Sequence, residues 1–146
     1  MTAFAIAAGL VLLVLVSHHW ALWALSFIAP GDGAPRHGRA LVAIVLLNAV
    51  HLLEIVFFAG ALVSLSGRGR LGVIAIGTID GPRSPHFLDF LHLSAVSYTT
   101  LGLSDFTATG GLRLVVALEA LTGFGALTWS ATYLYSAFRS SWSHRG

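Results

Sequence analysis

Cysteine and lysine are both absent from this 146-residue chain, and charged residues make up only 10% of it. The absence of cysteine excludes disulfide bonds and thiolate metal sites. The scarcity of charge excludes an ordinary soluble domain, because about a quarter of the residues in such a domain are charged. The eight arginines form no basic run interleaved with aromatic residues, so we expect no nucleic-acid partner.

Apolar residues dominate instead, at 56% of the chain, and they gather in long runs. A helix needs about 20 predominantly apolar residues to cross the hydrocarbon core of a membrane. Three segments reach that length, at residues 3–29, 40–66 and 112–138. No positively charged residue precedes the first, so we interpret it as a retained membrane helix rather than a signal peptide. A polar turn rich in proline and glycine at residues 30–39 joins the first two into an antiparallel hairpin, and the sequence therefore predicts an integral, multi-pass membrane protein.

The segment between the second and third spans has a different pattern. Ser84 followed by Pro85 is typical of a helix start, and the apolar positions after it predict a helix at residues 85–98 that is too short to span. Residues 99–105 follow directly and combine small polar residues with a glycine and an acid, which predicts irregular backbone. Such backbone at membrane depth must be buried in protein or line a water-filled cavity, so the pattern indicates a re-entrant loop beside a pore.

This loop contains the run Thr100-Leu101-Gly102-Leu103-Ser104-Asp105, directly after Ser97-Tyr98-Thr99. The run resembles the T-V-G-Y-G-D filter motif of the potassium channel superfamily, in its two-span-per-pore bacterial form. The resemblance covers residues 40–138. Arg113 stands where such channels often have a basic residue at the start of the inner helix. Gly123, ten residues further on, stands where the family's inner-helix hinge glycine is expected.

The resemblance implies an all-α membrane protein of three transmembrane helices with a re-entrant pore helix and filter loop, assembled as a homotetramer in the lipid of a prokaryotic plasma membrane. It implies passive conduction of potassium or another monovalent cation through rings of backbone carbonyls. It implies no enzyme activity, no cofactor and no small-molecule substrate. The filter is expected on the extracellular side and the C-terminus in the cytoplasm. The implied parts are an N-terminal helix (1–30), a short loop (31–39), a pore domain (40–138) made of outer helix (40–66), turret (67–84), pore helix (85–98), filter (99–105) and inner helix (112–138), and a cytoplasmic tail (139–146).

The same resemblance assigns site residues. The implied filter is Thr99, Thr100, Leu101, Gly102, Leu103, Ser104 and Asp105, with potassium held at Thr100, Leu101 and Gly102, and the implied cavity lining is Phe124, Leu127, Ala131 and Tyr135. Two departures alter the filter, because Leu103 replaces a tyrosine and Ser104 replaces the second glycine. A serine is costly wherever φ must be positive. We therefore expect the inner ion sites to be kept and the outer ones to be perturbed, which weakens potassium selectivity more than cation conduction.

Five polar residues interrupt the first two spans: His18, His19, Asn48, His51 and Glu54. In an antiparallel hairpin that turns near residue 34, position 18 lies level with position 50, so we expect these side chains to meet. Ionisable residues at mid-membrane are costly and indicate function by default. We favour a structural clamp, in which a histidine of the first span donates to Glu54 or Asn48. A divalent metal site and a pH sensor stay open, and a small membrane metal-binding or redox protein is the rival to a channel.

Glu119 lies one helical turn before Gly123. We expect it to face the short helix and to bond to His92 or Tyr98. In that position it would support the filter in place of a buried glutamate that some family members carry where this chain has Val96.

Overall fold

The structure is a computed structural model that describes residues 2–27, 36–66, 71–77, 84–102 and 105–142, with the backbone alone for 36–37 and 139–142. Leu103 and Ser104 of the expected filter lie outside the described residues. Within these ranges the chain forms four helices and two short strands. They are α1 (Thr2–Ser26), α2 (Arg36–Ser66), β1 (Ile74–Ile76), α3 (Phe87–Tyr98), β2 (Phe106–Ala108) and α4 (Leu112–Trp142).

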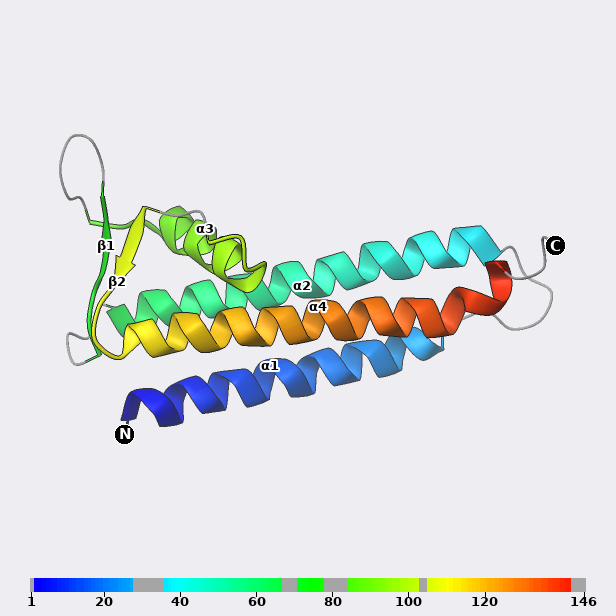
Figure 1. Ribbon diagram of the computed structural model, residues 1–146, viewed down its shortest axis with the longest axis horizontal. Coiled ribbons are helices and arrows are strands. Elements are labelled where there is room, and N and C mark those ends of the chain that lie inside the picture. The colour runs from blue at the N-terminus through cyan, green and yellow to red at the C-terminus, as the bar shows by residue number, and fades with distance from the viewer. Residues whose placement is uncertain (1, 28–35, 67–70, 78–83, 103–104, 143–146) are drawn as a thin grey trace.

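The three long helices run side by side, with α2 antiparallel to α1 and α4 (Figure 1). Each contains a segment long and apolar enough to cross a membrane, at Thr2–Ser26, Gly38–Ser66 and Leu112–Phe138. The prediction of three spans is therefore confirmed. Helix α4 continues to Trp142, past the expected end of the third span at residue 138. Helix α1 packs more extensively against α4 than against α2, although the hairpin with α2 is its connection along the chain.

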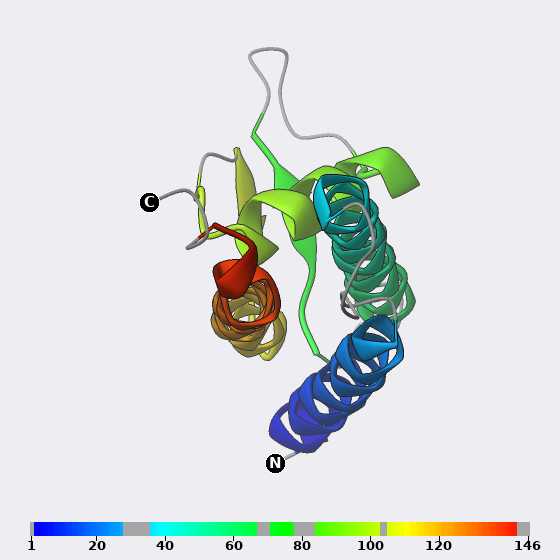
Figure 2. The ribbon, with the colours of Figure 1, turned by 90° about the vertical axis from the view of Figure 1, so that its right-hand side faces the viewer.

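Helix α3 lies across α2 and α4, on the side away from α1 (Figure 2). It begins at Phe87, with His86 as its N-cap in extended backbone, so the expected start at Ser84 and Pro85 is wrong. The carboxylate of Asp89 accepts a hydrogen bond from the His86 backbone N–H at 2.7 Å. Asp89 lies in the first turn, where its carboxylate satisfies the His86 N–H and interacts favourably with the positive end of the helix dipole. These interactions favour a helix start at Phe87, two residues after the expected one.

A small antiparallel sheet closes the segment that contains α3, and the expectation of an all-α fold missed it. Strand β1 pairs with β2 in the register Ile74↔Ala108 and Ile76↔Phe106. Gly77 N–H donates to the Asp105 carbonyl at 2.9 Å, which extends the pairing by one residue. The sheet joins the two ends of the segment between α2 and α4. Within this segment α3 points from the sheet end of the molecule toward the middle of the bundle, and β2 lies at the sheet end again (Figure 1).

The apolar core is built differently at the two ends of the bundle. A first cluster lies at the sheet end and draws on α1, α2, β1, α3 and α4, with Leu62, Phe90 and Leu112 among its buried residues. Another cluster, at the far end, consists of Leu22, Leu25 and Leu47 from α1 and α2, with α4 tyrosine and leucine side chains against it and no described residue of α3. Helix α3 therefore fills one half of the bundle and stops near its middle.

Gly123 permits a close contact between α3 and α4. A Cβ atom at this position would lie 2.1 Å from the Tyr98 carbonyl oxygen, a distance at which backbone must move. Gly125, two residues along the same helix, has nothing within 4 Å of its Cβ position. The helix continues through both glycines. Glycine is therefore required at position 123 by the packing against α3, and not by the path of helix α4 itself.

We expect Gly123→Ala to lower the stability of the protein by about 1–3 kcal/mol, the usual cost of overpacking a well-packed contact. The matched control Gly125→Ala should be neutral or slightly stabilising, because alanine is the better helix former and meets no neighbour. Thermal unfolding of the purified variants in detergent measures both. Equal unfolding temperatures for the two variants would contradict the close approach of Tyr98 to α4.

Candidate functional site

The C-terminal end of α3 is fixed by its last residue, Tyr98, which is fully buried. Its hydroxyl donates a hydrogen bond to the Glu54 carboxylate of α2, and the same hydroxyl lies 3.0 Å from Nδ1 of His51. Its carbonyl side lies against Gly123 of α4. Both partners lie near the middle of their helices, so α3 ends at about half the length of the bundle (Figure 1).

The chain reverses directly after Tyr98 through a Schellman cap. Thr100 N–H donates to the Ser97 carbonyl and Leu101 N–H donates to the Val96 carbonyl, each at 2.9 Å. This pair of bonds requires a left-handed residue between them, and Thr100 takes that conformation with φ of 57°. Left-handed backbone is rare for a β-branched residue and stores strain, which marks residue 100 as a specialised position.

Beyond the cap, the backbone carbonyls of residues 99–102 have no backbone or side-chain donor among the described residues. Thr100, Leu101 and Gly102 are also exposed on the single chain, and Leu101 is 63% exposed. Gly102 has φ of 66°, a second left-handed position within three residues. Consecutive carbonyl oxygens without donors are suited to coordinating a hard cation. Asp105, also exposed, is fixed by the bond that its carbonyl accepts from Gly77.

A hollow of about 360 Å³ lies beside these residues, between the end of α3 and the first turns of α4. Thr100 and Gly102 form one wall, and Arg113 and Ala117 form part of the other. Further along α4, the residues expected to line a cavity, namely Phe124, Leu127, Ala131 and Tyr135, are all exposed on the single chain. They belong to a surface, not to the core, and nothing in the described chain covers them.

Glu119 faces α3 as expected, but its partner is Ser94, so the expected bond to His92 or Tyr98 is wrong. The Ser94 hydroxyl contacts Glu119 Oε1 and donates to the Ile55 carbonyl of α2 at 3.0 Å. The register explains the choice, because Ser94 lies one turn before Tyr98, and Glu119 lies one turn before Gly123. His92 points elsewhere, with its ring 6.0 Å from that of Phe106. Among the described residues, Glu119 Oε2 has no hydrogen-bond partner.

Polar side chains from all four helices meet beside Tyr98, and all of them are buried. This polar cluster consists of His18 of α1, His51 and Glu54 of α2, Tyr98 of α3 and Ser130 of α4. Nδ1 of His18 lies 3.0 Å from Glu54 Oε1, and Nδ1 of His51 lies 3.3 Å from Glu54 Oε2. The expected meeting of His18, His51 and Glu54 is what the structure shows.

Two residues expected in this cluster lie outside it. His19 is exposed and its ring packs 5.8 Å from that of Trp129, because adjacent residues on a helix point about 100° apart. Asn48 is also exposed, and its amide donates to the Ile44 carbonyl of its own helix at 2.9 Å. Ser130 and the Tyr98 hydroxyl were missed. Nothing in the sequence distinguishes Ser130 from the other small polar residues of its span.

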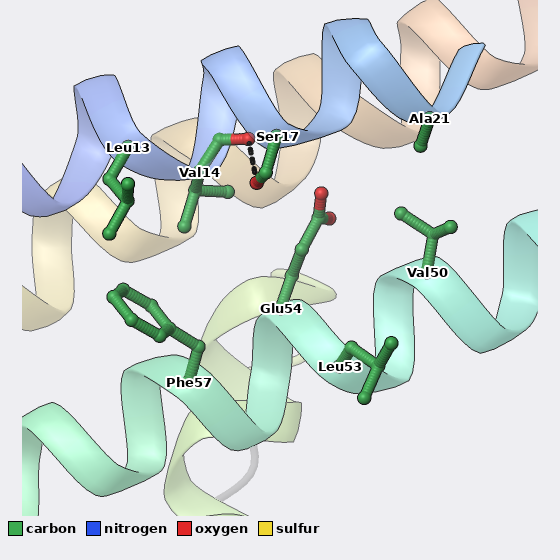
Figure 3. A pocket seen from close by; sticks show the side chains of 8 residues that line it. All are labelled: Leu13, Val14, Ser17, Ala21, Val50, Leu53, Glu54 and Phe57. Carbon is green, nitrogen blue, oxygen red and sulfur yellow. Dashed lines mark hydrogen bonds between the residues drawn. The ribbon is translucent and has the colours of Figure 1, made fainter. Parts of the chain in front are cut away.

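A cavity of about 440 Å³ lies between α1 and α2 and opens onto the cluster (Figure 3). The Glu54 carboxylate points into it from α2 toward α1, and Ser17 is the other polar residue in its wall (Figure 3). The rest of the wall is apolar, with Leu13 and Phe57 at one end. Glu54 thus contacts the cluster with both carboxylate oxygens and also forms part of the cavity wall.

The comparisons with known proteins give one match. A family described as ion channel matches residues 50–140, which include the second half of α2, all of α3 and nearly all of α4. This is more than half of the chain, and α1 lies outside it. No curated protein and no solved structure matches the chain.

We expect Tyr98→Phe to destabilise the protein by about 1–3 kcal/mol, because the ring still packs while Glu54 loses a buried donor. The matched control is Tyr135→Phe, which removes a hydroxyl from a tyrosine that is 60% exposed. Chemical or thermal unfolding in detergent gives both values. If the two substitutions have the same effect, the Tyr98 hydroxyl does not anchor α3.

Proposed function

The chain belongs to the ion channel family, and from that membership we propose that it is the pore-forming subunit of a homotetrameric channel for monovalent cations, with residues 99–105 as the selectivity filter. An ion channel is an integral membrane protein and not an enzyme, in agreement with the three apolar helices. Family membership does not specify the ion, the number of subunits or the residues along the ion path, and these three points are what we propose.

The observation that carries the proposal is the path of the chain from α3 to β2. A helix ends half-way along the bundle, and the carbonyls of residues 99–102 that follow it have no donor among the described residues. In a membrane, such backbone is stable only within protein or beside a water-filled cavity. On one chain these residues are exposed, so other copies and water must surround them. A ring of re-entrant loops around a water-filled pore meets both conditions.

The surface of α4 supports assembly into such a ring. Leu121, Phe124 and Tyr135 are each at least 60% exposed, and Leu101 of the loop is equally exposed. One chain supplies one side of a carbonyl ring, and closed cyclic symmetry supplies the others. Four copies, the number implied by the resemblance to potassium channels, would place each 99–105 loop against the pore axis and cover these apolar side chains.

The ion follows from the chemistry of the loop. Carbonyl oxygens and the Thr100 hydroxyl are neutral ligands that replace the water of a monovalent cation. Asp105 adds a negative charge where the loop returns to the sheet and favours cations over anions. Potassium is the ion that the T-L-G core favours, and Ser104 in place of glycine makes discrimination against sodium weak.

The same geometry supports an orientation. The N-terminus of α1, the sheet and the entrance to the 99–105 loop lie at one end of the molecule (Figure 1). With the filter facing outward, that end is extracellular. The connection between α1 and α2 and the C-terminal end of α4 then lie on the cytoplasmic side.

We expect wild-type protein in liposomes to pass potassium down a gradient and Gly102→Ala to lower this flux about tenfold or more. Left-handed backbone costs an alanine about 1–2 kcal/mol, and a carbonyl that rotates to relieve this strain leaves the pore axis. The matched control is Gly60→Ala in α2, where nothing lies within 4 Å of the Cβ position. Its flux should equal that of the wild type. No flux from wild type or control, with correctly inserted protein, would sink the proposal.

Ser104→Gly in the same assay tests the proposed weak selectivity. We expect the ratio of potassium to sodium flux to rise about tenfold, because a cost of about 1–3 kcal/mol for a serine where φ must be positive corresponds to a factor of roughly 5 to 160. Wild-type protein should pass both ions, with a smaller ratio of potassium to sodium flux than Ser104→Gly. A wild-type ratio already as high as that of Ser104→Gly would show that serine is tolerated at this filter position.

A further inference from the structure

The polar cluster has a two-sided geometry that ordinary core packing does not require. The rings of His18 and His51 are stacked, with centroids 5.3 Å apart and planes 27° apart. Both Nδ1 atoms face the Glu54 carboxylate, at 3.0 and 3.3 Å. Both Nε2 atoms face the Ser130 hydroxyl, at 3.2 and 3.1 Å. The two stacked imidazoles therefore both direct Nδ1 toward the acid on one side and Nε2 toward the hydroxyl on the other.

Side chains alone cannot give the two rings the same hydrogen bonds, because the Ser130 hydroxyl has one hydrogen and can donate to only one Nε2. Either one histidine is a cation paired with Glu54, or His51 is the Nε2–H tautomer and its Nδ1 accepts from the Tyr98 hydroxyl, which then no longer donates to Glu54. A metal cation bound on the Nδ1 side would make the two rings equivalent. Both Nε2–H groups then donate to the two lone pairs of Ser130, and every polar atom of the two rings is satisfied.

We infer that His18, His51, Glu54 and the Tyr98 hydroxyl form a binding site for one divalent transition-metal ion of the zinc type. Ligand atoms of the two histidines and Glu54 lie within 4.8 Å of one another. The corners of a tetrahedron around zinc are about 3.3–3.4 Å apart for bonds of about 2.0–2.1 Å. The distance of 3.0 Å from His18 Nδ1 to Glu54 Oε1 and that of 3.3 Å from His51 Nδ1 to Glu54 Oε2 are close to that spacing, and a small rotation of the carboxylate would bring one oxygen to both nitrogens. Tyr98, 3.0 Å from Nδ1 of His51, supplies the fourth corner.

The chemistry of the ligands selects the class of metal. Calcium and magnesium take oxygen ligands, whereas two imidazoles with a carboxylate suit zinc and its neighbours. Net charge near the middle of a membrane is costly. A doubly charged ion with the Glu54 carboxylate and a Tyr98 phenolate has no net charge, and the phenol proton leaves to solvent when the metal binds. Ser130 has the role usual for a group behind metal-bound histidines, because it accepts their outer N–H groups and fixes the rings.

The cavity between α1 and α2 leaves space for an ion beside the Glu54 carboxylate. It has a volume of about 440 Å³ and reaches the Glu54 carboxylate, which points into it (Figure 3). A bound ion would connect α1, α2 and the last residue of α3, directly before the 99–105 loop. It would thus couple α1, which lies outside the family match, to the proposed filter. Metal binding does not require ion conduction, so the two proposals fail independently.

The test is metal binding by full-length protein purified in detergent without a polyhistidine tag and stripped with chelator. Zinc content after equilibration and the visible absorption of bound cobalt give the stoichiometry and the geometry. We expect one ion per chain, with a tetrahedral cobalt spectrum. His18→Ala should lose this binding, and Ser130→Ala should weaken it about 10- to 100-fold, the usual effect of removing a group that orients metal-bound histidines. The matched control His19→Ala, at an exposed neighbour, should bind like the wild type.

Wild-type protein that binds no zinc, or His18→Ala that binds it as tightly as the wild type, would overturn the inference in favour of a hydrogen-bonded clamp. If His18→Ala does not fold, the cobalt spectrum of the wild type decides. An octahedral spectrum, or none, would reject the site, and a tetrahedral one that needs about 10- to 100-fold more cobalt in Ser130→Ala would support it. Zinc should also raise the unfolding temperature of wild type and His19→Ala, because it binds only the folded state.

Discussion

The hydrogen bond between Tyr98 and Glu54 sets the depth at which α3 ends, and the rest of the structure around the 99–105 loop depends on that depth. A helix that stops inside an apolar layer leaves polar backbone groups without water, so its last turn needs partners from the protein. Tyr98 supplies a side-chain anchor to α2, and its carbonyl side fits against Gly123 of α4. The Schellman cap then satisfies the Val96 and Ser97 carbonyls and turns the chain back, which leaves the next carbonyls available.

Four further contacts hold the segment that contains α3 in register with the long helices. Ser94 joins α3 to the Ile55 carbonyl of α2 and to Glu119 of α4, one turn above the contact between Tyr98 and Gly123. At the end of the bundle, the β1–β2 pairing and the bond between Gly77 and Asp105 fix the other side of the loop. Backbone hydrogen bonds therefore hold the described residues at both ends of the 99–105 loop. Fixed ends of this kind suit the proposed coordination of an ion by the loop carbonyls.

Helix α1 gives the bundle a feature outside the family match. It packs mainly on α4 and sends one buried histidine to the cluster around Glu54. The acid that anchors Tyr98 thus has a partner on every long helix, directly or through Ser130. Such a network is costly to leave half-satisfied in an apolar environment, so its members act as one unit. A change in the protonation of His18 would reach Tyr98, directly before the 99–105 loop, through Glu54 or through Ser130 and His51.

The sequence by itself determined the membrane class, the three spans, the short helix and the loop after it, because each depends on hydropathy or composition summed along the chain. It also placed His18 level with His51 and Glu54, since hairpin geometry fixes height along a helix. Only the tertiary structure decided which way each side chain points around its helix: His18 inward and His19 outward, Ser94 rather than His92 toward Glu119. It alone showed the pairing of Ile74–Ile76 with Phe106–Ala108 and the start of α3 at Phe87. Rotation about a helix axis and pairing between distant strands depend on neighbours that are far away in the chain, and no local pattern records them.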